Sequence, residues 1–470
     1  MLAQLAPKVG EDLVAILQLD LEIARRQDLD HAALEFYVFF STHRGAREVT
    51  RLSPSGQIGK TVKVRLDCFA ATVAPPPLFH SPLAPPLQAG PGEASAYIED
   101  LDDLTAGNAV RLLRNGEEAF PAWLDAIDAA STRISMEMYI FDDDRIGRRF
   151  ADALCCAARR GVSVRLLYDF IGCRHASPEF FANMRRAGVY TVAYHPYRLW
   201  RPRFWTLIRR NHRKTLVCDG QVAFVGGINV ADAWLPATDG GGGWHDVAVE
   251  VRGPAVQVIE QTFLRTWNWR ARRRFRFKRS RVHRPAPAGD VALAAIANRE
   301  LVDRFSIRRA ALHAIRASRE RTYLVSPYFM PDIGFINGLA RAVARGVDVR
   351  VLVPVASDSL LADLTSRASF ARLLKAGIRL FQHNPVAHSK ALLVDREFVS
   401  IGSYNFDHRS LVYNLELVVN ALDRDCNEAL AATLVEDMAA GTEIRWEEFC
   451  RRPLLTRILE RLAYGLRHWL

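Results

Sequence analysis

Residues 212–229 read HRKTLVCDGQVAFVGGIN, and residues 388–405 read HSKALLVDREFVSIGSYN. Both stretches begin with His-x-Lys, place an Asp five residues after the Lys, and end in Gly-(Gly/Ser)-x-Asn at the same spacing. In each, apolar β-branched runs flank the Asp, a pattern that predicts a β-hairpin with its turn at this residue. The repeat therefore predicts that one structural unit occurs twice in the chain.

The sequence around the two hairpins repeats as well. ARRGVSVRLLYDF (158–170) matches VARGVDVRVLVPV (343–355) as a helix end, a glycine C-cap and a buried strand. A further strand is predicted upstream of each, in RISMEMYIF (133–141) and RTYLVSPYF (321–329). We therefore expect an α/β fold of two similar halves, residues 96–285 and 286–470. Each half is a mixed sheet flanked by helices, and the halves pack about a pseudo-twofold axis around one active site.

The N-terminal region lies outside this repeat. Residues 74–93 are rich in proline and glycine, which predicts a stiff linker and a boundary near residue 95. Residues 1–95 are thus interpreted as an extension with a proline-rich linker, and nothing in them indicates chemistry.

The composition restricts the class of partner. The chain of 470 residues is 49% apolar and carries a net charge of +11, which favours nucleic acid, an anionic membrane surface or phosphate-bearing substrates. Its seven cysteines show no metal or redox spacing and predict free core thiols in a reducing compartment. We expect neither a signal peptide nor a membrane-spanning helix, so a protein acting on lipids would lie on the membrane surface.

The His-x-Lys stretches carry the predicted chemistry. On a strand, His212 and Lys214 would share one face. A lone histidine of this kind is ordinarily structural, but an identical second copy favours a shared cleft. That cleft would hold two imidazoles, two ammonium groups and two carboxamides, from the residues His212, Lys214, Asn229, His388, Lys390 and Asn405.

These groups suit a phosphodiester. The lysines and asparagines would stabilise the charge on the non-bridging oxygens. One histidine would attack phosphorus, and the other would protonate the leaving alkoxide and then deprotonate the incoming alcohol. Because the lysines supply positive charge, we expect no metal ion or other cofactor in the reaction.

Several nearby residues complete the candidate site. Asp219 and Asp395 belong to the repeated motif and are grouped with the catalytic residues, although their place at a hairpin turn favours a structural role. Asp246 and Glu416 are candidates for orienting the imidazoles, with the pairing left open. The candidate substrate-binding residues are Asn229, Asn405, Gly227 and Ser403. The last two occupy the Gly/Ser position of the motif Gly-(Gly/Ser)-x-Asn, where small residues allow close approach of a ligand.

The paired motifs resemble those of the phospholipase D superfamily. The segments GNAVRLLRNGEEAF, MEMYIFDDD, SPYFMPD and IGSYNFDHRSLVYNLE further resemble bacterial cardiolipin synthases, over roughly residues 105–470. The chain looks most similar to the short type without N-terminal transmembrane helices. This resemblance implies that His212 is the nucleophile, that His388 is the general acid and base, and that Glu137 lies near the cleft, where it is grouped with the substrate-binding residues.

The resemblance also implies the reaction. A phosphatidyl group would pass from one phosphatidylglycerol to a second through a phosphohistidine, giving cardiolipin and glycerol. The rivals are a phospholipase D that hydrolyses to phosphatidic acid, a nuclease of the same superfamily, and a lipid-binding protein without catalysis. The use of phosphatidylethanolamine as second substrate and the oligomeric state stay open.

Three segments are predicted to contact a membrane. Basic and aromatic residues alternate in residues 265–284 and 197–214, which suits an anionic lipid surface, with a solvated loop or a nucleic-acid patch as the alternative. At the C-terminus, an apolar stripe predicts an amphipathic helix in the interface or a helix packed on the core; its members are Leu455, Leu459, Leu462, Leu466 and Trp469. We expect peripheral association with the cytoplasmic face of a bacterial inner membrane, phosphatidylglycerol as substrate, and no nucleic-acid partner.

Overall fold

The computed structural model describes residues 36–41, 47–52, 62–64, 94–196, 208–271, 285–298, 304–357, 359–384 and 386–465. The chain divides into two compact units, Met1–Pro86 and Leu87–Leu470. In the first unit, three antiparallel strands form a sheet in sequence order: β1 (Phe36–Ser41), β2 (Arg47–Leu52) and β3 (Val62–Val64). The division falls nine residues before the boundary expected near residue 95, and the segment interpreted as a linker lies outside the described residues.

The second unit contains both copies of the predicted repeat. Its first half consists of β4 (Thr105–Arg114), α2 (Asn115–Ala129), β5 (Arg133–Met138), α3 (Arg145–Arg159), β6 (Ser163–Asp169), α4 (Pro178–Arg186), β7 (Tyr190–Tyr194), β8 (Thr215–Cys218), β9 (Val222–Gly226), β10 (Val247–Arg252) and α6 (Val256–Ala271). Short 3-10 helices lie before β4, at Ala94–Tyr97 (η1) and Leu101–Asp103 (η2), and before β10, at Asp232–Trp234 (η3) and Ala237–Asp239 (η4).

The second half repeats this order, with α10 inserted between its hairpin and β17, and then adds three elements. It consists of β11 (Val291–Ala297), α7 (Ser306–Ala317), β12 (Arg321–Val325), α8 (Ile333–Ala344), β13 (Asp348–Pro354), α9 (Leu360–Lys375), β14 (Arg379–His383), β15 (Ala391–Val394), β16 (Phe398–Gly402), α10 (His408–Val412), β17 (Leu417–Leu422), α11 (Arg424–Ala440), β18 (Thr442–Ile444), α12 (Trp446–Cys450) and α13 (Leu454–Gly465).

Strand order makes the internal symmetry visible. One continuous sheet runs β18-β14-β13-β12-β15-β16-β17-β11-β4-β10-β9-β8-β5-β6-β7. From the antiparallel β11–β4 junction outward, the strands of the second half follow as β11-β17-β16-β15-β12-β13-β14. Those of the first half follow in the equivalent order β4-β10-β9-β8-β5-β6-β7, and β18 is added beyond β14. In each half three strands run parallel and the hairpin strands join antiparallel, as in β5-β6-β7 beside β8-β9. The expected pair of mixed α/β halves is confirmed.

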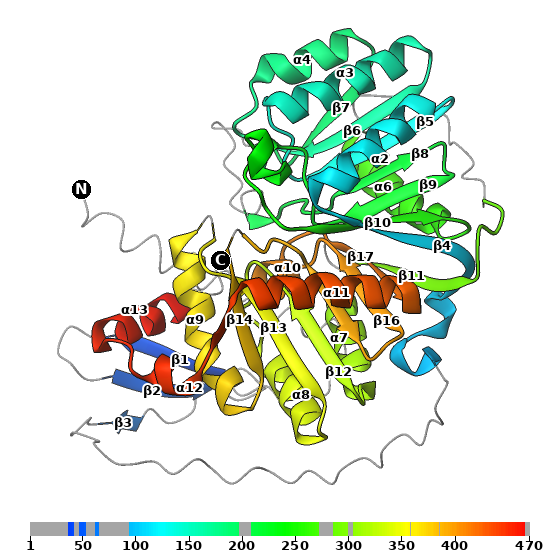
Figure 1. Cartoon of the computed structure of the whole chain (residues 1–470). Helices are drawn as coiled ribbons and strands as arrows, with labels where there is room; N and C mark the ends of the chain where they lie inside the picture. The colour runs from blue at the N-terminus through cyan, green and yellow to red at the C-terminus, as the bar shows by residue number, and fades with distance from the viewer. Residues whose placement is uncertain are drawn as a thin grey trace, which may run out of the picture. The chain divides into compact units, whose positions relative to one another are not determined.

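Helices cover the outer face of each half, and the inner faces share a core (Figure 1). Helices α2, α3 and α4 pack on one half, around Phe120, Trp123 and Phe150. Helices α7, α8 and α9 form the corresponding layer on the other half. A third cluster joins the valine-rich faces of β9 and β10 to those of β15, β16 and β17, with α6 and α11 at its margins. This shared cluster holds the two halves together.

The backbone conformation explains why both helix–strand connections contain a glycine. Helices α3 and α8 are followed by Gly161 and Gly346, with φ of 92° and 90°. Left-handed backbone of this kind is costly for residues with a Cβ, so glycine ends both helices and starts both buried strands.

Two details differ from the expectations. Residues 94–104, which were divided between the extension and the first half, pack on the second half: Tyr97 and Ile98 lie in its core, and the Tyr97 hydroxyl donates to Asp395 at 2.7 Å. The cysteines are only partly core thiols, since Cys156 and Cys450 are exposed.

Candidate active site

Both histidine segments are held by the opposite half. His212 and Lys214 lie in an extended segment just before β8, and His388 and Lys390 lie just before β15, so the expected placement within a strand is corrected by a few residues. Residue 211 forms an isolated parallel bridge with Leu415, and residue 387 forms one with His245. Each histidine is therefore fixed where the end of a strand of one half meets a loop of the other.

One cavity contains groups from both halves. It has a volume of about 220 Å³, and its lining includes His212, Asn229, His388 and Asn405. Both histidines are buried, and both line the cavity. The predicted convergence of the two motifs on one site is thus what the structure shows.

His212 pairs with a carboxylate of the second half. Its Nδ1 lies 3.1 Å from both carboxylate oxygens of Glu416 and 3.0 Å from the Ser403 carbonyl oxygen. Because all of these are acceptors, Nδ1 carries the proton and Nε2 keeps its lone pair. Burial lowers the pKa of His212, with Glu416 opposing this shift. Burial alone would raise the pKa of Glu416, but His212 and Lys214 hold it below its ordinary value.

His388 pairs with a carboxylate of the first half. Its Nδ1 donates to Asp246 Oδ2 at 2.6 Å, and the indole of Trp234 donates to the same oxygen at 3.0 Å. Burial and the Lys390 ammonium lower the pKa of His388 to about 4, with Asp246 acting against both. The pairing left open by the sequence is therefore crossed: each half orients the other half's histidine.

The two lysines lie behind the imidazoles. Lys214 Nζ donates to the His212 carbonyl oxygen at 2.7 Å, and Lys390 Nζ donates to the carbonyl oxygen of His388. Lys390 Nζ also lies 3.8 Å from Asp246. Burial and then the Lys390 charge hold the pKa of Lys214 well below its ordinary range. Two buried cations that disfavour each other in this way favour an anion nearby, although neither lysine is among the residues that line the cavity.

The two asparagines line the same cavity differently. The Asn229 side-chain oxygen accepts from the Ile140 backbone N–H at 3.0 Å, which orients its amide. The Asn405 side-chain oxygen is buried and accepts no hydrogen bond from the described part of the chain. Such a group is costly to bury alone and suits a ligand that binds there.

Asp219 and Asp395 do not belong with the catalytic groups. Asp219 accepts from the backbone N–H groups of Ser131, Thr132 and Arg133 at 2.8 to 2.9 Å. Asp395 likewise accepts from three successive backbone N–H groups, of residues 319–321. Both have positive φ, of 54° and 50°, at their hairpin turns. Their carboxylates cap the start of the neighbouring strand, so their placement in the catalytic set is corrected.

Gly227 and Ser403 also have a different role from the one expected. A Cβ on Gly227 would lie 2.2 Å from Asp246 Oδ1, so the close approach at this glycine is made by the orienting carboxylate and not by a ligand. At the equivalent position, the Ser403 hydroxyl donates to Glu416 at 2.5 Å. Both residues support the carboxylates, and neither lines the cavity.

Glu137 contacts the residue next to His212 and not His212 itself. It is buried in β5 and accepts from the Asn211 side-chain amide at 2.7 Å. Burial raises the pKa of Glu137, and the Arg213 charge offsets this in part. Because Asn211 directly precedes His212, Glu137 positions the catalytic segment and does not reach the cavity itself.

Other cavity residues were not found from the sequence. Tyr139 packs edge-on against the His212 ring at 4.8 Å, and Trp244 lies 5.0 Å from the His388 ring. Arg210 and Arg409 add guanidinium groups to the lining, although Arg210 is also bound to buried Asp169 at 2.6 Å. The arginine beside the first motif, in RRNHRK, was the available signal for Arg210.

Comparison with known proteins agrees with this geometry. A family model described as cardiolipin synthase, PLD-like domain, matches residues 123–267 and 311–438. The chain belongs to the cardiolipin synthase family. The two matched segments fall on the two halves and contain both His-x-Lys motifs.

Individual relatives match across both halves. A cardiolipin synthase of Geobacillus sp. is 32% identical over 360 residues, which is 75% of this chain and 70% of the relative. The major cardiolipin synthase of Bacillus subtilis is 31% identical over 76% of this chain and 75% of its own length. Cardiolipin synthase A of Pseudomonas fluorescens is 34% identical over 76% and 74%.

A solved structure supports the fold. Phosphatidylserine synthase from Haemophilus influenzae superposes with a TM-score of 0.60 at 11% sequence identity, covering 81% of this chain and all of that protein. At this identity the likeness concerns the fold alone.

Proposed function

We propose that this chain is a cardiolipin synthase that transfers a phosphatidyl group from one phosphatidylglycerol to another. The observation that carries the proposal is one cavity lined by both His212 and His388, each of which is paired with a carboxylate of the opposite half, Glu416 and Asp246 respectively. Two oriented imidazoles above two buried ammonium groups suit a reaction in which a phosphodiester is cleaved and formed again.

In the first step, Nε2 of His212 attacks phosphorus and the bond from phosphorus to the glycerol oxygen breaks. Protonated His388 gives its Nε2 proton to that oxygen, and glycerol leaves. The phosphate itself supports this protonation, because an anion in the cavity raises the pKa of His388 from its low value in the free protein. Lys214, Lys390 and the two asparagines stabilise the equatorial oxygens, so that positive charge comes from the chain.

In the second step, a glycerol hydroxyl of another phosphatidylglycerol attacks the phosphohistidine. Neutral His388 takes the hydroxyl proton, the P–N bond to His212 breaks, and cardiolipin is released. His388 is protonated at the start of the first step and neutral at the start of the second, so it acts first as the acid and then as the base, while His212 carries the phosphoryl group between the steps.

The surroundings of the cavity suit a lipid better than a nucleic acid. A second cavity of about 250 Å³ shares Met330 and Asp407 with the catalytic one. Apolar side chains from Ile333, Phe335 and Leu411 contribute to its walls. We propose that it accommodates the apolar part of a lipid next to the reacting phosphate.

A route onto the membrane is proposed at α13. Its stripe is exposed, with Leu455, Leu459 and Leu462 at 68%, 46% and 66%, so core packing is not its role. No helix in the described part of the chain is long and apolar enough to cross a bilayer. We propose peripheral binding to an anionic, cytoplasmic membrane face through this stripe. Leu466, Trp469 and most of the basic segments 197–214 and 265–284 lie outside the described residues.

The membrane proposal has its own test. Replacing the three leucines with serine should weaken binding to phosphatidylglycerol vesicles by about 10-fold, or about 1.4 kcal/mol. Hydrolysis of a soluble phosphodiester should stay unchanged, because α13 contributes no group to the catalytic cavity. Unchanged vesicle binding would contradict this role for the helix.

The function itself is tested with purified protein and phosphatidylglycerol vesicles. Lipids are separated after incubation, and free glycerol is assayed in the same sample. We expect cardiolipin and glycerol in equal amounts. Phosphatidic acid in place of cardiolipin would give the acceptor role to water and make the protein a hydrolase. Activity on DNA but not on lipid would favour the nuclease alternative.

A further inference from the structure

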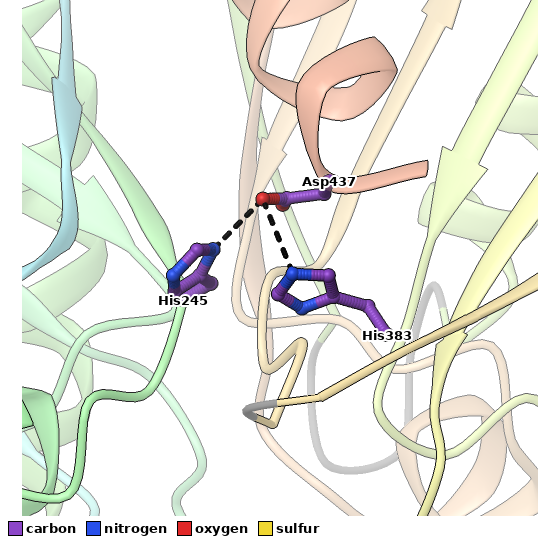
Figure 2. Close-up of side chains that lie close together, drawn as sticks. All are labelled: His245, His383 and Asp437. Atoms are coloured by element: carbon purple, nitrogen blue, oxygen red, sulfur yellow. Dashed lines mark hydrogen bonds and ion pairs between the residues drawn. The ribbon is translucent and has the colours of Figure 1, made fainter. Parts of the chain in front are cut away.

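A second polar cluster lies where the two halves meet, outside the catalytic cavity (Figure 2). It consists of His245, from the loop before β10, His383, from the end of β14, and Asp437, from α11. His245 Nδ1 lies 2.8 Å from Asp437 Oδ1, and His383 Nε2 lies 3.9 Å from the same oxygen. Three ligand-type atoms, one from each side chain, lie within 4.8 Å of one another.

We propose that these three residues bind a divalent transition metal ion of the zinc class. Bonds of about 2.0 to 2.1 Å in a tetrahedral site separate the ligand atoms by roughly 3.3 Å. Two of the three separations are 2.8 and 3.9 Å, on either side of this value, and all three ligand atoms lie within 4.8 Å of one another, so side-chain rotations that bring the two imidazoles together would complete the geometry. Two imidazoles with one carboxylate form a donor set that suits zinc and its neighbours better than magnesium or calcium.

Burial of the cluster also fits a metal site. The side chains of His383 and Asp437 are 3% and 8% exposed, whereas that of His245 is 34% exposed. The site is thus closed on the side of β14 and α11 and open beside His245. A water molecule could occupy a fourth position there, as in zinc sites with three protein ligands.

The pseudo-symmetric position in the other half provides the main argument. His245 directly precedes the carboxylate residue Asp246 and forms a β-bridge with Ala387, the residue before His388. In the other half, Leu415 holds the equivalent position: it directly precedes Glu416 and forms a β-bridge with Asn211, the residue before His212. By strand register, Tyr194 occupies the place of His383.

There the same packing problem is solved without a polar cluster. Leu415 and Tyr194 join Phe263 and Trp267 of α6 in an apolar cluster. The fold therefore does not require a His–Asp–His set at this position, where Arg270 of α6 lies over the Tyr194 ring instead. A His–Asp–His set in only one of two equivalent positions points to a ligand specific to that side.

An ion at this place would affect the segment that holds His388. The His245 carbonyl oxygen accepts from the His388 backbone N–H at 2.7 Å, and Asp246, which orients His388, is the next residue. A metal that joins His245 to His383 and Asp437 would fix this segment against the second half. The ion takes no part in the phosphoryl transfer proposed above, and its binding can be tested whether or not that function holds.

The test uses the full chain, freed of metal by dialysis against a chelator. Co²⁺ serves as the probe because its visible absorption reports tetrahedral coordination, and Zn²⁺ is then added as competitor. The decisive variant is His383→Gln, which removes one ligand and leaves the His245–Asp437 pair in place. Asp437→Asn is a second variant, and His175→Gln, at an exposed histidine of the first half, is the matched control.

We expect the wild type and His175→Gln to bind one Co²⁺ with a tetrahedral spectrum that Zn²⁺ displaces. In His383→Gln and Asp437→Asn, affinity should fall by more than about 100-fold, since even second-shell losses cost about 10- to 100-fold. Zn²⁺ should raise the Tm of the wild type but not of His383→Gln. Equal Co²⁺ binding by wild type and His383→Gln, with both folded by circular dichroism, would overturn the proposal.

Discussion

The two histidines occupy equivalent positions in the repeat but experience different surroundings. His212 has a carboxylate that Ser403 and Ser410 also bind, at 2.5 and 2.7 Å, and a tyrosine ring beside it. His388 has two tryptophan rings beside it, and Lys390 Nζ lies 2.7 Å from its Nδ1 and 3.2 Å from its Nε2. No hydrogen bond between Lys214 Nζ and the ring nitrogens of His212 is found in the described structure.

This difference supports the two catalytic roles proposed above. A histidine with a low pKa is a strong acid once protonated, which suits donation to a leaving alkoxide. His388, at about 4, fits that description when a bound phosphate supplies the compensating charge. His212, with its Nδ1–H held by a carboxylate and a carbonyl oxygen, presents a basic Nε2 and fits the nucleophile. The predictions below test this asymmetry.

The largest effect is expected from removing either imidazole. His212→Ala and His388→Ala should each lower phosphatidyl transfer by at least about 10⁴-fold, because the two groups act as one unit. Cardiolipin formation on vesicles measures this. Full activity in either variant would contradict the paired site.

A chromogenic substrate distinguishes the two roles. Nitrophenolate leaves without protonation, so His388→Ala should still release one equivalent of nitrophenol per site from a nitrophenyl phosphodiester. His212→Ala should release none, since it lacks the attacking nitrogen. A burst in His212→Ala alone would exchange the two assignments.

The crossed carboxylates should give the next largest effect. Asp246→Asn and Glu416→Gln should each lower turnover by about 10³-fold, somewhat below the loss of about 10⁴ that the amide variant of a triad aspartate causes. Nitrogen NMR should locate each change: Glu416→Gln alters the Nδ1 signal of His212, and Asp246→Asn alters that of His388. The opposite pattern would refute the crossed pairing.

A smaller effect concerns the pKa of His388. Replacing Lys390 with Met removes a cation next to the ring, so the imidazolium form becomes less unfavourable and the pKa of His388 should rise from about 4. The NMR titration of the free protein measures the shift. The equivalent Lys214→Met should move this pKa less, because the charge of Lys214 acts on His388 more weakly than the charge of Lys390. Equal shifts would remove the asymmetry between the halves.

Much of the fold was predictable because the repeated elements are specified by short sequence patterns. Glycine after a helix, valine-rich strands and the aspartate turn each act over a few residues, and they occur twice at matching spacing. The packing of residues 94–104 on the second half was not predictable. Tyr97 reaches Asp395 across 298 positions of sequence, and no local pattern encodes such a contact.

The site was predictable in its members more than in its connections. His212, His388 and the asparagines converge as their repeated spacing indicated. The crossing of the carboxylates depends on how two halves dock, which spacing within one half does not specify. Gly227 shows the same limit: a glycine signals a close approach, but only the docked structure identifies Asp246 as the group that approaches.

The smallest effect on catalysis is expected at the hairpin turns. Asp219→Asn and Asp395→Asn should each change turnover by less than about 3-fold, since both aspartates cap a strand, but each should lower stability by about 1 kcal/mol. Asparagine tolerates the positive φ, so the variants test the charge and not the turn.

The pH dependence at Asp219 provides a check that catalysis cannot imitate. Partial burial would raise the pKa of Asp219, but hydrogen bonds from Arg133, Thr132 and Ser131 lower it well below its ordinary value. The resulting stability is present above the unfolded-state pKa of about 3.9 and is lost as the pH falls toward the folded-state value. Urea unfolding should therefore show a gap between wild type and Asp219→Asn that is full at neutral pH and narrows below about pH 4. A constant gap would contradict the capping role of the Asp219 carboxylate, and a large loss of turnover at neutral pH would return Asp219 to the catalytic set.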